Sequence, residues 1–429
     1  MSKRKWLKIS AAILTLVLLL ALAVTAYAVH ASRRVYDVPF PEVSADRSPQ
    51  GVARGAVIFH ATCEACHRAA TADRASGAPM AEVPAWLGQF HSGNITSDPR
   101  AGIGAISDAT AARMIRYGVN RSGHWAPMPA YSMSDADLAA VLGFLRSDDP
   151  LFRPEPRPTP PSHLSTAGSL ALFLGGVLTP PSRPRVIRGP ARAPTADYGR
   201  YLAEGIYMCG DCHTPGFDAD KVHGPDAFAG GAELKDVTGK AIYSPNLTQD
   251  AETGIGRWSR DQFALAIRSG IRPDQTAIGY PMPRFRGADD IEVDALLAYL
   301  RSFPAHKNQV PGRRAVVGSS ATTASPIGSS THPDPAAAFE RLGCAACHGK
   351  GAAYEAKLRQ AAGKPAADVA RWIRNPELFR PGTPMPTFAS VLDEGAALEL
   401  ATWIQEALVP NRQHTESGAA PSQARWLRP

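Results

Sequence analysis

The six cysteines of this 429-residue chain constrain it more than any other feature. They form three pairs with two residues between the partners, and a histidine follows each pair at once. The pairs are Cys63 and Cys66, Cys209 and Cys212, and Cys344 and Cys347, and the histidines are His67, His213 and His348. With 12 histidines in the chain, chance would supply that neighbour about one time in 36, so three in succession require a chemical explanation.

The pattern C-x-x-C-H is the attachment signature of c-type haem. Two thiols on one short helical turn can reach the two vinyl groups of a porphyrin, and the adjacent histidine then lies under the iron as its proximal ligand. A zinc site needs two such pairs close together, whereas these pairs lie far apart in the sequence. A chain of this length also needs no disulfide framework. The sequence therefore predicts three covalently bound haem c groups.

A second pattern suggests the other axial ligand of each iron. Each segment contains Ile-Arg and then, 11–14 residues after the arginine, the methionine of a Pro-Met-Pro tripeptide. These methionines are Met128, Met282 and Met385. A thioether is a soft donor that favours ferrous iron, and the flanking prolines stiffen the loop that presents it. We predict histidine–methionine ligation of all three irons, with His124 as the alternative to Met128.

Two further sets of polar residues recur between these motifs. The arginines of the Ile-Arg pairs, Arg116, Arg268 and Arg374, are expected either to pair with haem propionates or to end a solvated helix. Asn94 and Asn246 each begin a short Asn-(Ile/Leu)-Thr turn and are expected to hydrogen-bond a propionate. The third segment lacks this turn, so its haem is expected to be more exposed.

Residues 9–29 are uncharged and long enough to cross a bilayer as one helix. Basic residues precede them, which predicts a cytoplasmic N-terminus and an exported remainder. A cleaved signal peptide is the alternative, but the apolar run is longer than the usual hydrophobic core of such a peptide. Residues 1–36 carry +6 of the net charge of +7. The rest of the chain is nearly neutral, so a nucleic-acid-binding surface is not expected.

The remaining chain divides by composition. We expect cytochrome c-like domains at 50–149, 195–304 and 335–409, a proline-rich linker at 150–194, a flexible linker at 305–334 and a disordered tail at 410–429. A second apolar run, at 164–178, is too short for a confident membrane span. We interpret it as an interfacial or docking segment, with a small buried helix as the alternative.

The order of helix, C-x-x-C-H, methionine loop and closing helix resembles the class I cytochromes c in all three segments. The stretch NLTQDAETGIGRWSRDQFALAIRSG, followed by YPMP, resembles the triheme cytochrome c subunits of membrane-bound alcohol, gluconate and sorbitol dehydrogenases. The resemblance implies a mostly α-helical protein with three tandem cytochrome c domains. Its haem residues fall on the cysteines, histidines and methionines named above.

In that family the cytochrome takes electrons from a catalytic subunit and passes them to ubiquinone or another carrier. We therefore expect a non-enzymatic cytochrome, anchored in a bacterial inner membrane with its haem domains in the periplasm. It would transfer single electrons between a dehydrogenase or other donor and the respiratory chain. The alternatives are a peroxidase-like haem enzyme and a fixed cytochrome subunit of a terminal oxidase or reductase.

Overall fold

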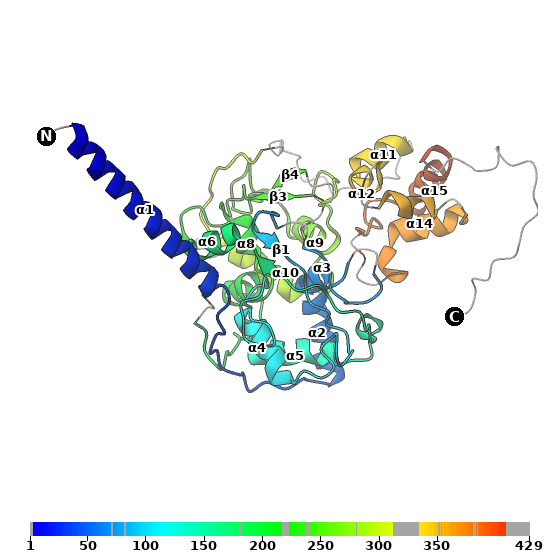
Figure 1. Cartoon of the computed structure of the whole chain (residues 1–429). Coiled ribbons are helices and arrows are strands. Elements are labelled where there is room, and N and C mark those ends of the chain that lie inside the picture. The colour runs from blue at the N-terminus through cyan, green and yellow to red at the C-terminus, as the bar shows by residue number, and fades with distance from the viewer. Residues whose placement is uncertain are drawn as a thin grey trace, which may run out of the picture. The chain divides into compact units, whose positions relative to one another are not determined.

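The computed structural model of the chain is mostly helical and falls into two compact units (Figure 1). The first unit comprises 1–269 and 281–318, and the second comprises 270–280 and 319–429. The structure describes residues 3–69, 72–80, 83–179, 182–216, 223–236, 240–279, 281–311, 334–350, 352, 354–361, 363–380, 383 and 385–408. The prediction of a mostly α-helical fold is confirmed. The tail 410–429 and most of the linker 305–334 lie outside the described residues.

The first segment is built on two helices that cross closely. Its helices are α2 (Pro49–Thr62), α3 (Glu64–His67), α4 (Asp108–Tyr117) and α5 (Asp135–Leu145). Ser48 caps α2 by accepting a hydrogen bond from the Gly51 N–H, and a proline follows at the first helical position. At the crossing of α2 and α5, a Cβ on Gly55 would lie only 2.0 Å from the carbonyl oxygen of Ala140. Only glycine permits this approach of the two backbones.

The second segment repeats this crossing. Its elements are α7 (Ala196–Arg200), the π-helical turn η2 (Tyr201–Ile206), α8 (Cys209–His213), α9 (Arg260–Ser269) and α10 (Asp290–Arg301). Here a Cβ on Gly199 would lie 1.9 Å from the carbonyl oxygen of Ala295. A small hairpin of β3 (Glu233–Lys235) and β4 (Ala241–Tyr243) pairs antiparallel beside these helices. The equal glycine contacts show that the first and last helices of both segments pack in the same way.

The third segment lies in the second unit. Its elements are α11 (Pro335–Arg341), α12 (Cys344–His348), α13 (Glu355–Arg359), α14 (Ala366–Arg374), η4 (Pro376–Leu378), α15 (Glu394–Trp403) and η5 (Ile404–Leu408). Phe339 and Trp403 hold its first and closing helices together, with ring centroids 5.4 Å apart. The turn 270–280 belongs to the same unit, where Arg341 donates to the Gln275 side chain at 3.2 Å.

The first two segments share one hydrophobic core. Phe59, Phe144 and Phe152 pack edge to face on one side of it, and Phe228 and Tyr299 do so on the other. Phe152 comes from η1 (Pro150–Phe152), inside the proline-rich stretch 150–194. That stretch is therefore more structured than its composition suggests. It also contains β2 (His163–Leu164), which pairs with β1 (Gly88–Gln89), and α6 (Thr166–Leu174).

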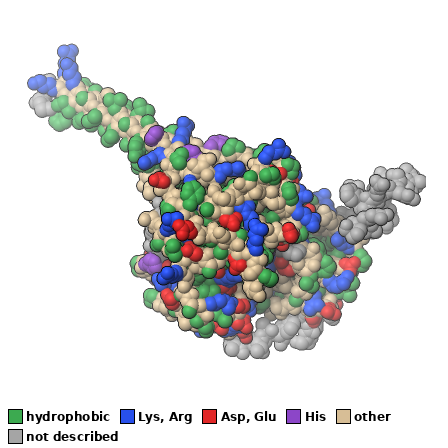
Figure 2. All heavy atoms as spheres, turned by 90° about the horizontal axis from the view of Figure 1, so that it is seen from below, with side chains coloured by type: hydrophobic (Ala, Val, Ile, Leu, Met, Phe, Trp, Pro, Cys, Tyr) green, Lys and Arg blue, Asp and Glu red, His purple; other side chains and the backbone are tan. Residues whose placement is uncertain are grey.

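The N-terminal apolar run lies in α1 (Lys3–Ala31). Of the described helices it alone is long and apolar enough to cross a membrane, and its most apolar stretch is not buried. Figure 2 shows hydrophobic side chains along this helix and Lys and Arg at its far end. The second apolar run forms α6, which packs against α1. Gly168 and Ser169 of α6 are buried, whereas Leu174 is 69% exposed, so the short helix is neither a span nor a fully buried core helix.

Candidate haem sites

Each C-x-x-C-H motif forms a short helix, α3 with Cys63 as its N-cap, α8 or α12, after the first helical stretch of its segment (Figure 1). One helical turn places the two cysteines of a pair on the same side, as attachment to one porphyrin requires. None of the six thiols forms a disulfide. Among the described residues, no cluster of three or more His, Cys, Asp or Glu side chains is placed to hold a metal ion alone. The pairs are therefore not brought together as a zinc site would require.

The three histidines make the same hydrogen bond. The Nδ1 of His67 lies 2.8 Å from the carbonyl oxygen of Gly93, and that of His213 lies 2.9 Å from the carbonyl oxygen of Pro245. The Nδ1 of His348 lies 3.0 Å from the carbonyl oxygen of Tyr354. A carbonyl only accepts, so each Nδ1 carries the proton, and Nε2 is the ring nitrogen through which each imidazole can bind a metal. This is the tautomer and support that a metal-binding imidazole needs.

Burial favours the same form of these ligands. It lowers the pKa of His67, and it lowers the pKa of His348, although the backbone hydrogen bond opposes the shift in each case. A neutral imidazole is the form that binds iron. Burial also raises the pKa of the Cys63 thiol to about 11 and that of Cys209 to about 12. Both thiols thus lie in surroundings of low polarity.

The Asn-(Ile/Leu)-Thr turns position two of the carbonyl acceptors. Gly93 and Pro245 directly precede Asn94 and Asn246 in the chain. The Asn94 side-chain oxygen accepts from the N–H and the hydroxyl of Thr96, at 2.9 and 2.7 Å. Its amide group donates to the carbonyl oxygen of Glu155 at 2.9 Å. The side chain thereby holds the turn whose carbonyl supports His67.

Asn246 repeats this arrangement in the second segment. Its oxygen accepts from the N–H and the hydroxyl of Thr248, at 2.9 and 2.8 Å, and its amide group donates to the carbonyl oxygen of His306 at 2.8 Å. The propionate contacts expected of both asparagines stay a prediction. In the structure their side chains hold the turns whose carbonyls support His67 and His213. The third segment, which lacks the turn, uses the carbonyl of Tyr354 instead.

The three recurring arginines also have protein partners. Arg116 is fully buried and donates to the carbonyl oxygen of Met133 and to Asp135, at 3.2 and 2.6 Å. Arg268 bonds the carbonyl oxygen of Ala288 at 2.6 Å and Asp290 at 2.9 Å. In both cases the carboxylate is the first residue of the closing helix.

Arg374 makes the equivalent contacts in the third segment. It donates to the carbonyl oxygen of Leu392 at 3.1 Å and to Glu394, the first residue of α15, at 3.0 Å. In every segment the carbonyl lies two residues before the carboxylate. The propionate contact that the sequence suggests for these arginines stays a prediction. In the structure Arg374 and its two counterparts join the middle helix to the start of the closing helix, which borders the methionine loop.

The methionine loops are tied to the same middle helices. The aromatic residue three places after each methionine donates its backbone N–H to that helix: Tyr131 to the carbonyl oxygen of Ile115 at 3.0 Å, and Phe285 to that of Ile267 at 2.9 Å. Phe388 does so to Arg374 at 3.1 Å. The methionines of these loops, Met128, Met282 and Met385, are half-buried. The loops are therefore fixed in position, as a ligand-bearing loop must be.

The alternative ligand His124 lies on the first of these loops. Its Nδ1 is 3.2 Å from the carbonyl oxygen of Arg34, and its backbone pairs with Val35. These contacts hold it beside the segment that follows α1. Met128 and His124 thus differ in their surroundings, and a spectroscopic test can separate them.

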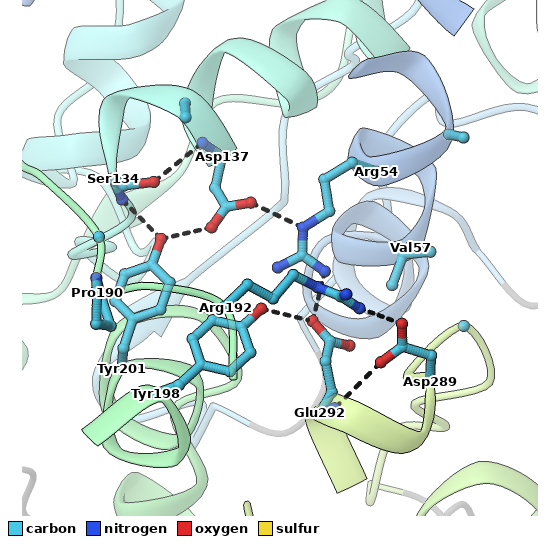
Figure 3. A pocket seen from close by; sticks show the side chains of 14 residues that line it. Arg54, Val57, Ser134, Asp137, Pro190, Arg192, Tyr198, Tyr201, Asp289 and Glu292 are labelled. Atoms are coloured by element: carbon cyan, nitrogen blue, oxygen red, sulfur yellow. Dashed lines mark hydrogen bonds and ion pairs between the residues drawn. The ribbon is translucent and has the colours of Figure 1, made fainter. Parts of the chain in front are cut away.

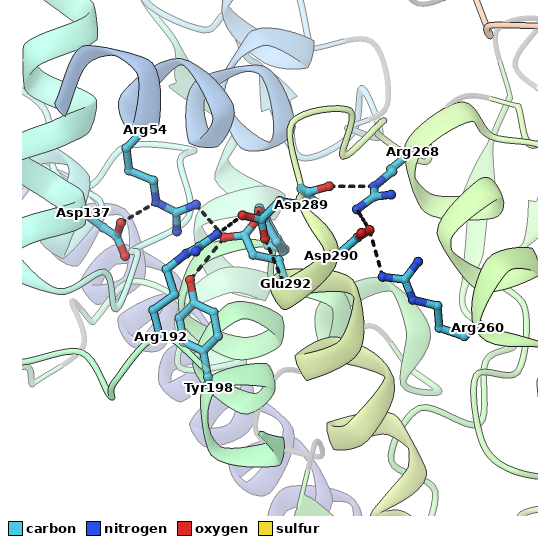
Figure 4. Close-up of polar contacts among 11 residues, drawn as sticks. Arg54, Asp137, Arg192, Tyr198, Arg260, Arg268, Asp289, Asp290 and Glu292 are labelled. Atoms are coloured by element: carbon cyan, nitrogen blue, oxygen red, sulfur yellow. Dashed lines mark hydrogen bonds and ion pairs between the residues drawn. The ribbon is translucent and has the colours of Figure 1, made fainter. Parts of the chain in front are cut away.

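A partly buried polar network that local sequence patterns do not predict lies between the first two segments (Figures 3 and 4). Arg54 of α2 donates to Asp137 of α5 at 2.7 Å and to Glu292 of α10 at 2.5 Å. The hydroxyls of Tyr198 and Tyr207 donate to Glu292, at 3.2 and 3.0 Å. Burial opposes the charge on Arg54, but the two carboxylates hold its pKa above the ordinary value. A pocket of about 580 Å³ opens beside the network.

This network has an internal symmetry. Asp137 and Glu292 are both the third residue of a closing helix, and Arg54 and Tyr198 both directly precede the glycine at the helix crossing. The sequence contains this relationship, because the paired residues occupy equivalent positions in the first two segments. No local sequence pattern indicates that the first two segments pack against each other.

The helices, the C-x-x-C-H turns and the supported imidazoles form the arrangement that is typical of c-type cytochromes. Residues 52–148 match the family model of cytochrome c, so the first segment is a cytochrome c domain. The predicted resemblance to cytochrome c is thereby confirmed for the first segment.

More specifically, the chain is similar to cytochrome c subunits of bacterial dehydrogenases. It is 29% identical over 322 residues to the cytochrome c subunit of alcohol dehydrogenase (quinone) of Gluconacetobacter polyoxogenes, covering 69% of this chain and 64% of that protein. It is 31% identical over 278 residues to the gluconate 2-dehydrogenase cytochrome c subunit of Pantoea cypripedii, covering 59% of this chain and 60% of that one. The fructose dehydrogenase cytochrome subunit of Gluconobacter japonicus is 25% identical over 360 residues, which cover 77% of this chain and 71% of that protein. The chain thus spans about 64% of the first of these relatives.

Proposed function

We propose that this chain is a membrane-anchored triheme c-type cytochrome that transfers single electrons between a periplasmic dehydrogenase and the respiratory chain. The observation that carries the proposal is the recurrence of one histidine arrangement, in which Nδ1–H donates to a backbone carbonyl, at His67, His213 and His348. A family match exists for the first segment, and the shared geometry extends the assignment to the other two.

Each haem would be held by its cysteine pair and by the histidine of its motif, with the methionine of its loop on the other face. The irons would supply one-electron redox chemistry. The chain's part is to keep the ligands fixed. The carbonyl holds each imidazole in one orientation, and the arginine contacts hold the ends of each methionine loop. Rigid ligands keep the rearrangement that accompanies a change of charge small, which suits electron transfer.

The partner is inferred from the relatives, which are named as cytochrome subunits of alcohol, gluconate and fructose dehydrogenases. A dehydrogenase subunit would reduce this chain, and a quinone or another respiratory carrier would reoxidise it. We place the protein in the inner membrane through α1. From Ile9, about 20 residues at 1.5 Å each reach Ala28 and match a hydrocarbon thickness of about 30 Å.

Isolation of the protein from membranes of its own host tests the function. A dehydrogenase subunit should co-purify, and its substrate should reduce the haems of the complex. Co-purification with a terminal oxidase or reductase instead, or turnover of peroxide by the chain alone, would contradict the proposal.

A further inference from the structure

We infer that α6, together with the turn that carries Trp86, forms a second membrane contact that lies in the outer lipid interface beside α1. This inference rests on the proposed anchoring of the chain by α1. It assigns a lipid surface to an apolar face that the haem sites do not use.

The two helices are held together at one level. The rings of Tyr27 in α1 and Phe173 in α6 meet edge to face, with centroids 5.3 Å apart. The hydroxyls of Ser32 and Ser169 lie 3.3 Å apart. Ala28 is fully buried at this contact level. The position of α6 along α1 is therefore fixed.

The level of this contact along α1 coincides with the edge of the hydrocarbon core of the bilayer. If the span begins at Ile9, it reaches the opposite boundary near Ala28. Tyr27 then lies where aromatic residues gather in membrane proteins. Arg33 and Arg34, exposed just beyond the helix, lie at the height of the lipid headgroups. Phe173, in contact with Tyr27, must lie at the boundary as well.

The outer side of α6 is apolar and uncovered. Leu174 is 69% exposed and Val177 is 48% exposed, and no charged residue occurs in 164–179. Water is a poor solvent for such a surface, whereas the lipid interface would bury it.

Trp86 extends the same face from a neighbouring turn and is 57% exposed. Ser165, the N-cap of α6, donates its hydroxyl to the carbonyl oxygen of Trp86 at 2.6 Å. A Cβ on Gly168 would lie 2.0 Å from the carbonyl oxygen of Leu87, so α6 is packed directly on this turn. Exposed tryptophan is enriched at membrane–water interfaces. The aromatic turn and the helix therefore form one built surface.

Fluorescent labels on single introduced cysteines test the inference in the full haem-loaded protein. The variants are Leu174→Cys on α6, Leu18→Cys on α1 as the positive control, and Leu378→Cys, which is 80% exposed in the second unit, as the negative control. The native thiols are bound to haem, so only the new cysteine reacts. Each protein is placed in phosphatidylethanolamine–phosphatidylglycerol vesicles with or without nitroxide-labelled acyl chains. The emission with nitroxide is divided by the emission without it, because quenching by haem is the same in both and cancels.

The labels at 18 and 174 should lose most of their emission in the nitroxide vesicles, and the label at 378 should lose none. Quenching at 18 but not at 174 would overturn the inference while leaving the anchor intact. In that case, access of iodide to the 174 label would show a water-facing helix, and protection would show a protein partner or a second copy. If neither the label at 18 nor the label at 174 is quenched, α1 does not lie in the bilayer, and the anchor itself is refuted.

Discussion

Nη1 of Arg54 lies 2.5 Å from Oε1 of Glu292, although the two residues belong to different C-x-x-C-H segments. The Glu292 side chain is only 1% exposed, so this ion pair is part of the shared interior of the two segments. The first two C-x-x-C-H segments are therefore joined by a specific contact to a buried carboxylate, with Asp137 as the third charged member.

Removing Arg54 should destabilise the protein severely. In Arg54→Met, the Glu292 carboxylate loses its charged partner inside the protein, and breaking such a pair costs about 3–5 kcal/mol. Denaturant unfolding of the haem-loaded protein, followed by circular dichroism, measures this. The control is Arg157→Met, whose side chain is 86% exposed in its pair with Glu155 and should cost less than about 1 kcal/mol. Equal losses of unfolding free energy in the two variants would show that the pair of Arg54 and Glu292 stabilises the protein no more than an exposed pair.

Alanine at the helix crossings should also destabilise the protein. A Cβ at Gly55 or Gly199 would meet a carbonyl oxygen at 2.0 or 1.9 Å, so the helices would have to separate. Overpacking of this kind costs about 1–3 kcal/mol. Gly363→Ala is the matched control, because its Cβ would meet nothing within 4 Å. The same unfolding measurement decides the outcome, and unchanged stability of both Gly→Ala variants would contradict the close crossing.

The turn at Asn246 should tune the second haem. In Asn246→Ala the turn loses its hydrogen bonds to Thr248 and His306, and the Pro245 carbonyl moves away from His213. A weaker acceptor makes the imidazole less basic, which disfavours ferric iron and raises the potential. Redox titration should show one haem shifted upward, with the third haem as the internal control because Tyr354 supports its histidine. A downward shift, or equal shifts of all haems, would be inconsistent with this role.

Met385 should be the distal ligand of the third haem. Met385→Ala would remove the soft donor, and the potential of that haem should fall by about 59 mV for each tenfold loss of ferrous preference. The sulfur-to-iron charge-transfer absorption should lose the contribution of one haem. If the band keeps its full intensity and no potential moves, the ligand lies elsewhere.

The first haem offers a choice that the same absorption resolves. Met128→Ala should remove part of the sulfur-to-iron band, whereas His124→Ala should leave it intact. If Met128→Ala leaves the band unchanged and His124→Ala instead shifts the potential of one haem, the distal ligand is His124, whose Nδ1 lies 3.2 Å from the Arg34 carbonyl oxygen in the structure.

Local patterns predicted the haem motifs and the mostly helical fold, because a C-x-x-C-H turn and a helix each depend on nearby residues. The partners of the polar residues were not predictable in this way. Arg268 pairs with Asp290, which is 22 residues away and meets it only when the closing helix folds back. Arg54 and Glu292 are 238 residues apart, and their contact depends on the packing of two repeats. Proline content suggested a linker where Phe152 in fact enters the core, because burial of one aromatic ring outweighs local composition.

The number of haems bound to the chain tests the central claim most directly. The protein is purified from membranes, and the ratio of covalently attached haem to polypeptide is measured by mass spectrometry of the denatured chain. We expect three haems, and proteolytic fragments containing Cys63, Cys209 and Cys344 should each carry one. A fully matured protein with two haems or fewer, or a fragment whose cysteines remain free thiols, would contradict the account.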